Sequence, residues 1–235
     1  MEGEPKNREE YQERKTGISE VVGEDQETEE RFLVFYEKIF EDQKLDEYEK
    51  PKTKEEAEVV EGILEKMPEF VKRYDGKPVP LKLKHVHFFD AEKIPFETGD
   101  NIITNGFYHP HTQSIGIVDQ KSILVNARSV VHEALHFNSF LSVQSESGKP
   151  GIRRSGFKIK TFEKEIYFYD INEAVIEELA SRFHKEYFPS IAHLSGAKFD
   201  SNLPPSAREF VFAYPEKRTT KKNQTKNLKK GWGKK

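Results

Sequence analysis

Apolar side chains recur every three or four residues in four stretches of the chain, a spacing that predicts four amphipathic helices. The stretches cover residues 30–45, 53–75, 126–140 and 171–188. Thr53 begins the second stretch as a candidate N-cap, and Asp75-Gly76 ends it as a stop signal. The helices therefore have predictable starts and ends as well as predictable apolar faces.

Strand patterns lie between these stretches. Residues 79–90 alternate between apolar and polar side chains, so we expect a strand with His85 and His87 on a solvated face. Residues 101–126 predict two or three short strands broken by turn residues, and residues 151–170 predict a hairpin with its turn near 162–164. Helices, a small mixed sheet and two further helices together predict an α+β fold.

The two ends of the chain differ from the middle in charge. Acidic residues dominate positions 1–29 and lysines dominate positions 215–235, so the formal net charge of -3 hides two opposite tails. Neither end has enough apolar surface to offset its chain entropy, and we expect both to be disordered. The predicted order is an acidic arm (1–29), a helical segment (30–78), a domain that carries the chemistry (79–214) and a basic tail (215–235).

The chain contains no cysteine, which excludes disulfides and thiolate metal sites. Its first residues lack the apolar core of a secretory signal, and no apolar run approaches the ~20 residues of a membrane span. We therefore expect a cytoplasmic monomer with no membrane partner.

The stretch SVVHEALHFNSF, residues 129–140, carries the strongest chemical pattern. On a helix, His132 and His136 lie four residues apart and point their rings to the same side, where they can share one zinc ion. Glu133 is turned about 100° from His132, so it can reach a water on the metal without binding the metal itself. The alternative is a partly exposed helix whose histidines bond locally, but burying these groups among apolar residues without a metal would be costly.

A catalytic zinc needs a third protein ligand. Glu173 and Glu177 are also four residues apart, on the last predicted helix. One carboxylate can bind zinc while the other accepts the N–H of a ligand histidine. An isolated Glu177 or Glu178 would instead be an ordinary solvated side chain, whereas the apolar flanks and preceding Asn172 favour Glu173 as the ligand.

The pattern His132-Glu133-x-x-His136 followed by Asn172-Glu173-x-x-x-Glu177 resembles the gluzincins, the thermolysin-like zinc metallopeptidases, and most closely their compact minigluzincin type. The resemblance spans residues 79–188 and implies a zincin-like domain with an active-site helix and a glutamate-bearing helix. It implies His132, His136 and Glu173 as zinc ligands and Glu133 as general base. Glu177, which stands where thermolysin itself has Asp, would orient a ligand histidine with Asn172 nearby.

The implied reaction is hydrolysis of a peptide or protein substrate by a metal-activated water, with Glu133 taking the proton. The oxyanion needs a stabilising group. The candidates are Tyr108, His184, Tyr187, Arg153 and Arg154, and the sequence does not choose among them. Residues 112–118 are a candidate edge strand for aligning the substrate, with Gly116 allowing a peptide backbone to approach.

Two other functions remain open at this stage. The chain could be a catalytically silent zincin-fold protein that binds peptides. Alternatively, the lysine-rich tail with Trp232 could bind nucleic acid, because lysines neutralise phosphates and tryptophan stacks on bases.

Overall fold

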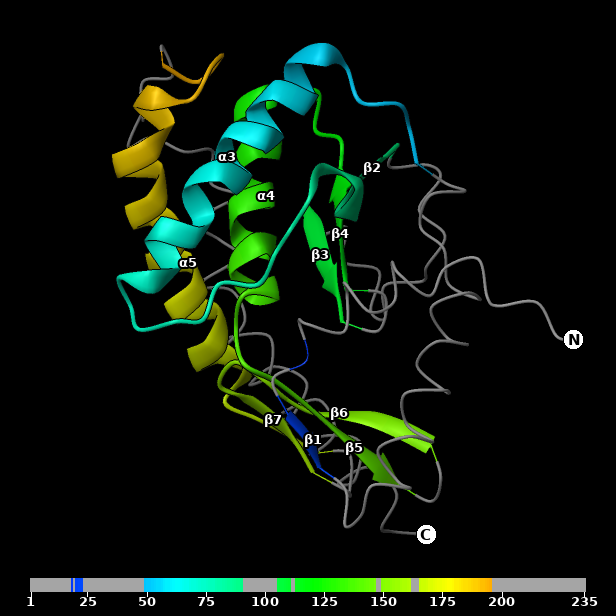
Figure 1. Cartoon of the computed structure of the whole chain (residues 1–235). Coiled ribbons are helices and arrows are strands. Elements are labelled where there is room, and N and C mark those ends of the chain that lie inside the picture. Colours follow the sequence, from blue (N-terminus) through cyan, green and yellow to red (C-terminus); the bar gives the residue numbers. More distant parts are fainter. Residues whose placement is uncertain are drawn as a thin grey trace, which may run out of the picture. The chain divides into compact units, whose positions relative to one another are not determined.

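The three-stranded sheet and the helices that cover it carry the largest part of the core. The computed structural model describes residues 18, 20–22, 49–90, 105–110, 113–146, 149–161 and 165–195. Helices α3 (Lys54–Lys72), α4 (Ile123–Phe137) and α5 (Tyr169–Tyr187) lie on one side of this sheet (Figure 1). Their apolar faces meet in one cluster that includes Ile63, Val130 and Phe183, each fully buried. The architecture is α+β.

Helix α3 begins where its capping signal predicts. The Thr53 side chain accepts a hydrogen bond from the Glu56 N–H (3.1 Å), and the Glu56 carboxylate accepts one from the Thr53 N–H (2.7 Å). This reciprocal pair satisfies two of the donors that a helix start leaves open. At the other end, Asp75 has a φ of 56° and the Gly76 N–H returns to the Val71 carbonyl (3.1 Å). The predicted start of this helix is confirmed, whereas its end at Lys72 comes three residues before the predicted stop at Asp75-Gly76.

Strand β4 (Ser114–Val118) is the central strand of the three-stranded sheet. It pairs in parallel with β2 (Val86–Phe89) and antiparallel with β3 (Gly106–His109). The prediction of an edge strand over 112–118 is therefore wrong, and β3 is an edge of this sheet among the described residues. Gly116 also has a different role, because a Cβ there would lie 2.3 Å from the Phe107 ring on β3. The glycine makes room for a neighbouring ring rather than for a substrate.

Of the predicted strand over 79–90, only Val86–Phe89 form β2, and a 3-10 turn over Leu83–His85 precedes it. All four residues of β2 are buried, so the alternating pattern did not mark a solvated side. His85 and His87 are 1% and 2% exposed, which corrects the expectation that they face solvent. His87 Nδ1 lies 2.9 Å from a Glu49 carboxylate oxygen, and the Lys82 N–H donates to His85 Nδ1 (3.2 Å). These contacts at Nδ1 offset part of the cost of burying the two rings.

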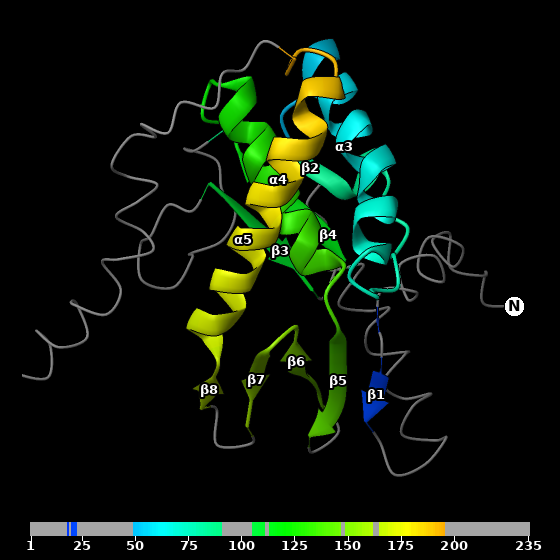
Figure 2. The same ribbon diagram turned by 90° about the vertical axis from the view of Figure 1, so that its left-hand side faces the viewer.

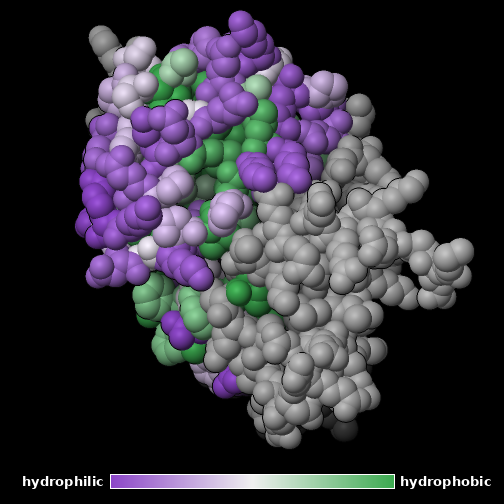
Figure 3. Space-filling view, viewed as in Figure 1, coloured by the Kyte–Doolittle hydropathy of each residue, from purple (hydrophilic) through white to green (hydrophobic). Residues whose placement is uncertain are grey.

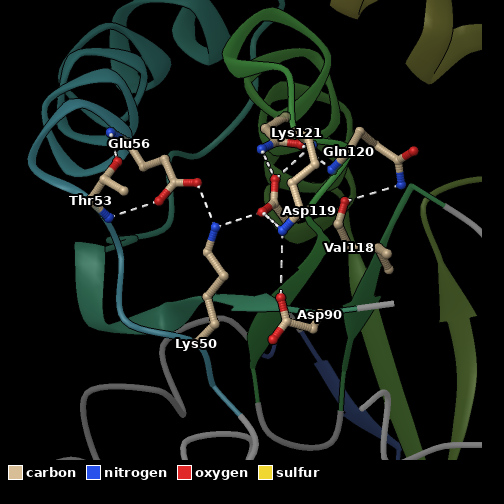
Figure 4. Close-up of polar contacts among 9 residues, drawn as sticks. Lys50, Thr53, Glu56, Asp90, Val118, Asp119, Gln120 and Lys121 are labelled. Atoms are coloured by element: carbon tan, nitrogen blue, oxygen red, sulfur yellow. Dashed lines mark hydrogen bonds and ion pairs between the residues drawn. The ribbon is translucent and has the colours of Figure 1, made fainter. Parts of the chain in front are cut away.

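A polar network fixes the turn between β4 and α4 (Figure 4). The Asp119 carboxylate accepts hydrogen bonds from Lys50 Nζ (2.6 Å), Lys121 Nζ (2.8 Å) and Asn126 Nδ2 (2.9 Å). Lys50 also donates to Glu56 of α3 (3.0 Å), so the network joins the starts of α3 and α4. We refer to Lys50, Glu56, Asp119, Lys121 and Asn126 as the Asp119 network.

A second sheet combines four strands from the connection between α4 and α5 with β1 from the N-terminal part of the chain. Its order is β1 (Glu20–Val22), β5 (Leu141–Glu146), β6 (Lys149–Ser155), β7 (Lys158–Lys160) and β8 (Ile166–Tyr167). Strands β7 and β8 are antiparallel, as the hairpin prediction requires, although its turn at 162–164 lies outside the described residues. Strands β1 and β5 had no clear signal in the sequence. Figure 2 shows this sheet beyond the C-terminal end of α4 and the N-terminal end of α5. The candidate metal ligands lie near these two helix ends.

Two predictions fall outside the described residues: the helix over 30–45 and the basic tail. The acidic arm is described only at residue 18 and at Glu20–Val22, where strand β1 pairs with β5 and corrects the expectation of disorder for that segment. The described residues all belong to a compact unit that ends at Ala197. Within them, no helix combines the length and the apolar character needed to cross a membrane.

Candidate metal centre

Helix α4 holds the two histidines side by side. Ser122 caps its start, and the helix runs without interruption through both residues to Phe137. The ring centroids of His132 and His136 are 4.9 Å apart, and their Nε2 atoms are separated by 3.1 Å. Two ring nitrogens therefore converge on one point, as the four-residue spacing predicts.

Helix α5 brings the third donor to the same point. Glu173 Oε2 lies 3.3 Å from His136 Nε2 and 3.4 Å from His132 Nε2. Donors at ~2.0–2.1 Å from a tetrahedral zinc lie about 3.3–3.4 Å from one another, so these separations suit that ion. Within the described parts of the chain, these three residues are the group of His, Asp or Glu side chains that could hold a metal.

The remaining ring nitrogens have partners that orient the rings. His132 Nδ1 lies 3.3 Å from Glu177 Oε2. The Asn172 amide lies 3.5 Å from His136 Nδ1 and donates to Glu173 Oε1 (3.4 Å). Partners of this kind fix the orientation of metal-binding histidines.

Asn172 is itself fixed by the turn between β6 and β7. Its side-chain oxygen accepts a hydrogen bond from the Phe157 N–H (2.9 Å). Gly156 precedes Phe157 with a φ of 57°, and a Cβ there would lie 2.3 Å from that same oxygen. A glycine is thus required both by the backbone and by the closeness of Asn172. The positive φ of Gly156 was not evident in the sequence.

A row of polar side chains, Arg128, Glu177 and His184, continues along the α4–α5 interface. Arg128 Nη2 lies 3.8 Å from Glu177 Oε1, one helical turn before His132 on α4. His184 is buried on α5, and burial, with the positive charge of Arg128 as a second cause, lowers its pKa to about 3. Sequence reasoning overlooked Arg128, although its four-residue spacing from His132 was a usable signal.

The ionisable groups of the cluster shift one another's pKa values. Burial opposes the charging of His132, yet hydrogen bonds to Glu173 and Glu177 raise its pKa to about 10. Burial alone would raise the pKa of Glu173, but hydrogen bonds from both histidines lower it below its ordinary value. Without a metal, the protonated His132 ring lies between two carboxylates, with Nδ1 towards Glu177 and Nε2 towards Glu173. A metal cation would take the place of the proton on Nε2.

Glu133 lies next to the ligands in a different environment. It is 8% exposed, and burial raises the pKa of its carboxyl group. The backbone N–H of Tyr108 on β3 hydrogen-bonds to this carboxylate. A Cβ on Gly106 would lie 3.1 Å from Glu133 Cγ, so the β3 backbone passes directly over this side chain. A carboxyl group with a raised pKa is suited to both accepting and returning a proton.

The two tyrosines that are candidates for stabilising the oxyanion lie at different distances from the metal ligands. The Tyr108 ring packs on Phe137 at 5.7 Å, and its hydroxyl accepts a hydrogen bond from Gln113 Nε2 (2.9 Å). The Tyr187 hydroxyl accepts a hydrogen bond from Arg73 (2.7 Å) and donates one to Glu69 (3.3 Å). Tyr187 is also about 21 Å along α5 from Glu173 at ~1.5 Å per residue. Tyr108 is thus near Glu133, whereas Tyr187 belongs to the α3–α5 contact.

The other cationic and imidazole candidates lie at the margins. His184 follows Glu177 along α5, farther from the metal ligands, and the Arg154 guanidinium lies 5.1 Å from the centre of the Phe140 ring. Arg153 is exposed on β6.

Lys158 is a residue that the sequence did not single out. Its Nζ lies 5.1 Å from the centre of the Tyr169 ring, one turn before Glu173 on α5. Burial lowers the pKa of Lys158, and the charge of Glu173 opposes that change. The electrostatic interaction with Glu173 places a cation at the edge of the candidate metal centre.

Comparison of the chain with protein-family models, with curated proteins and with solved structures gave no match. The likeness to gluzincins therefore rests on the motif itself, beside the arrangement of the side chains described above.

Proposed function

We propose that this chain is a zinc-dependent metallopeptidase with a zincin-like domain. The observation that carries the proposal is the convergence of three donor atoms, from His132, His136 and Glu173, at separations of 3.1–3.4 Å. Glu133, with its raised pKa, supplies the acid–base group that peptide hydrolysis requires.

The residues of the chain have separate tasks in this reaction. A zinc ion held by His132, His136 and Glu173 would supply a Lewis acid that polarises a carbonyl and makes water more acidic. Glu133 takes the proton of the attacking water and then gives it to the leaving amine. Glu177 and Asn172 hold the two imidazoles in the orientation that leaves both Nε2 atoms free to bind.

Strand β3 is suited to align the substrate. It is an edge strand among the described residues, and its backbone lies against Glu133. An extended peptide can pair with such an edge through main-chain hydrogen bonds. This pairing would place a scissile carbonyl beside the acid–base group.

The test compares Glu133→Gln with Glu178→Gln, an exposed α5 glutamate that serves as the control. Zinc content and cleavage of unfolded casein are measured for both variants and for the unaltered chain. Loss of the general base should lower kcat/KM by a factor of about 10²–10⁴, with zinc retained. Full activity in Glu133→Gln would contradict the mechanism. A chain that binds zinc but cleaves no peptide would favour the silent peptide-binding alternative.

A further inference from the structure

Exposed apolar side chains are concentrated at one place on the described surface. Seven large hydrophobic side chains are exposed among the described residues, and six of them lie where the second sheet meets the start of α5. We call this group the apolar shelf: Phe140, Phe157, Ile166, Tyr167, Phe168 and Ile171, exposed by 41–55%. In Figure 3, a small hydrophobic group lies below the hydrophilic surface of the helices, apart from the hydrophobic strip that runs between the helices. Concentrated exposure of this kind marks interaction sites in soluble proteins.

The apolar shelf adjoins the candidate metal centre. The Phe157 N–H donates to Asn172 (2.9 Å), which in turn contacts His136 and Glu173. Ile171 and Phe168 precede Glu173 by two and five residues, so their side chains leave α5 in other directions than the Glu173 carboxylate. The direct link between the shelf and the candidate metal centre is therefore the Phe157–Asn172 hydrogen bond.

Phe168 is held in an unfavourable backbone conformation. It occupies the N-cap position of α5 with a φ of 58°, and its side chain makes no capping hydrogen bond. Asn or Gly would adopt this conformation more readily, and Asn or Ser would cap the helix better. Neither the helix nor the core explains a phenyl group here, because the ring is 55% exposed. Strained residues of this kind cluster at functional sites.

The shelf also offers a strand edge and positive charge. Strand β8 lies at one end of the order β1-β5-β6-β7-β8, so its outer backbone groups have no strand partner among the described residues. An extended segment can add to such an edge. The Arg154 guanidinium lies 5.1 Å from the centre of the Phe140 ring of the shelf. This charge favours an acidic side chain in the bound segment.

We infer that the apolar shelf is a docking surface for polypeptide substrates, and that it selects extended segments in which large apolar side chains stand beside acidic ones. This inference rests on the proposed function, because it names the substrate class of the same site. The apolar side chains supply the affinity, and the β8 edge sets the direction of the segment.

The test uses the full chain with Glu133→Gln added, so that bound peptides are not cut. The probe is a fluorescein-labelled peptide in which Leu and Phe alternate with Asp, and binding is followed by anisotropy. Phe168→Asn combined with Ile171→Gln removes two shelf side chains, while the asparagine suits the positive φ. Tyr74→Ser is the matched control, because Tyr74 is 44% exposed but lies on the turn after α3.

We expect the shelf double variant to bind the probe at least about tenfold more weakly, because burial of two large side chains is lost. The Tyr74→Ser control should bind normally, and both variants should retain zinc. A second peptide with Lys in place of Asp should bind the unaltered shelf more weakly. Equal binding by the double variant would overturn the inference.

Two further measurements separate this inference from the proposed function and from a membrane role. Casein cleavage that depends on Glu133 but is unchanged by the shelf variants would leave the peptidase proposal intact and overturn the docking surface. Vesicles of phosphatidylcholine and phosphatidylglycerol provide the other comparison. Vesicle binding that is lost in the double variant, with peptide binding unchanged, would also overturn it and assign the shelf to a lipid surface.

Discussion

Helix α4 carries a polar cluster near each of its ends, and the two clusters are built on different principles. In the Asp119 network, acceptors face donors: one carboxylate receives Lys50, Lys121 and Asn126. In the metal centre, two imidazole nitrogens face each other at 3.1 Å, and one carboxylate oxygen faces both. The first arrangement is complete by itself. The second converges lone pairs on one point, which is what a cation requires.

This difference predicts that the two clusters respond to different perturbations. Substitutions in the Asp119 network should change the free energy of unfolding and leave metal binding unaltered. Substitutions in the metal centre should change metal binding first. Variants at each end of α4 therefore test whether the two clusters have separate roles.

Asp119→Asn should have the largest effect on stability. Loss of this buried charge leaves Lys50 with Glu56 and Lys121 with Asp90 as their remaining anions, and we expect the free energy of unfolding to fall by about 1–3 kcal/mol. The measurement is urea unfolding, with zinc content determined in parallel. A variant that loses zinc but keeps its unfolding midpoint would reverse the assigned roles.

The same network should make stability depend on acid. Burial alone would raise the pKa of Asp119, but hydrogen bonds from Lys121, Lys50 and Asn126 lower it below its ordinary value of 3.8. A group with a lowered folded-state pKa stabilises the fold above its unfolded value and ceases to do so as the pH falls through the folded value. The acid-induced loss of stability below pH 3.8 should therefore be smaller in Asp119→Asn than in the unaltered chain.

Glu177→Ala should have an intermediate effect that is confined to the metal centre. The side chain holds His132 Nδ1 at 3.3 Å and does not reach the ligand atoms. Loss of such a partner weakens metal binding by about 10–100-fold. Competition with a chromophoric chelator measures this change. Glu177→Gln, which keeps a hydrogen-bond acceptor, should lose less affinity than Glu177→Ala, and equal losses would show that orientation of His132 is not the cause.

The smallest expected effect is the pH dependence of zinc affinity near neutrality. The pKa of His132 is raised to about 10 in the metal-free chain, so zinc must displace a proton to bind. The apparent affinity should therefore increase as the pH rises, by about tenfold per pH unit for one proton released. Chelator competition at several pH values around neutrality tests this slope, and an affinity independent of pH would contradict the proton on His132 Nε2.

Local patterns were enough to predict some parts of this molecule. The capping signal at Thr53 and the four-residue spacings of His132–His136 and Glu173–Glu177 depend on one helix each, so the sequence carries them. That α4 and α5 meet at these residues was expected from the resemblance to gluzincins. The function of the cluster is still a prediction.

Other parts depend on contacts that no local pattern encodes. Lys50 meets Asp119 across 69 residues, and strand β4 becomes central only because β2 and β3 pair on either side of it. His85 and His87 are buried by the layers around β2, which their alternating neighbours do not reveal. Lys158 reaches Glu173 through a sheet whose order the sequence does not give.

The most direct test of the central claim is zinc content by elemental mass spectrometry, on the unaltered chain beside Glu173→Ala and Glu178→Ala. Glu178 is the control because it lies on the same helix with an exposed side chain paired to Arg182 (2.8 Å). The account predicts one zinc per chain in the unaltered protein and in Glu178→Ala, with the metal lost or much weakened in Glu173→Ala. An unaltered chain that takes up no zinc after loading, or a Glu173→Ala chain that holds it as tightly, would contradict the proposed metal centre.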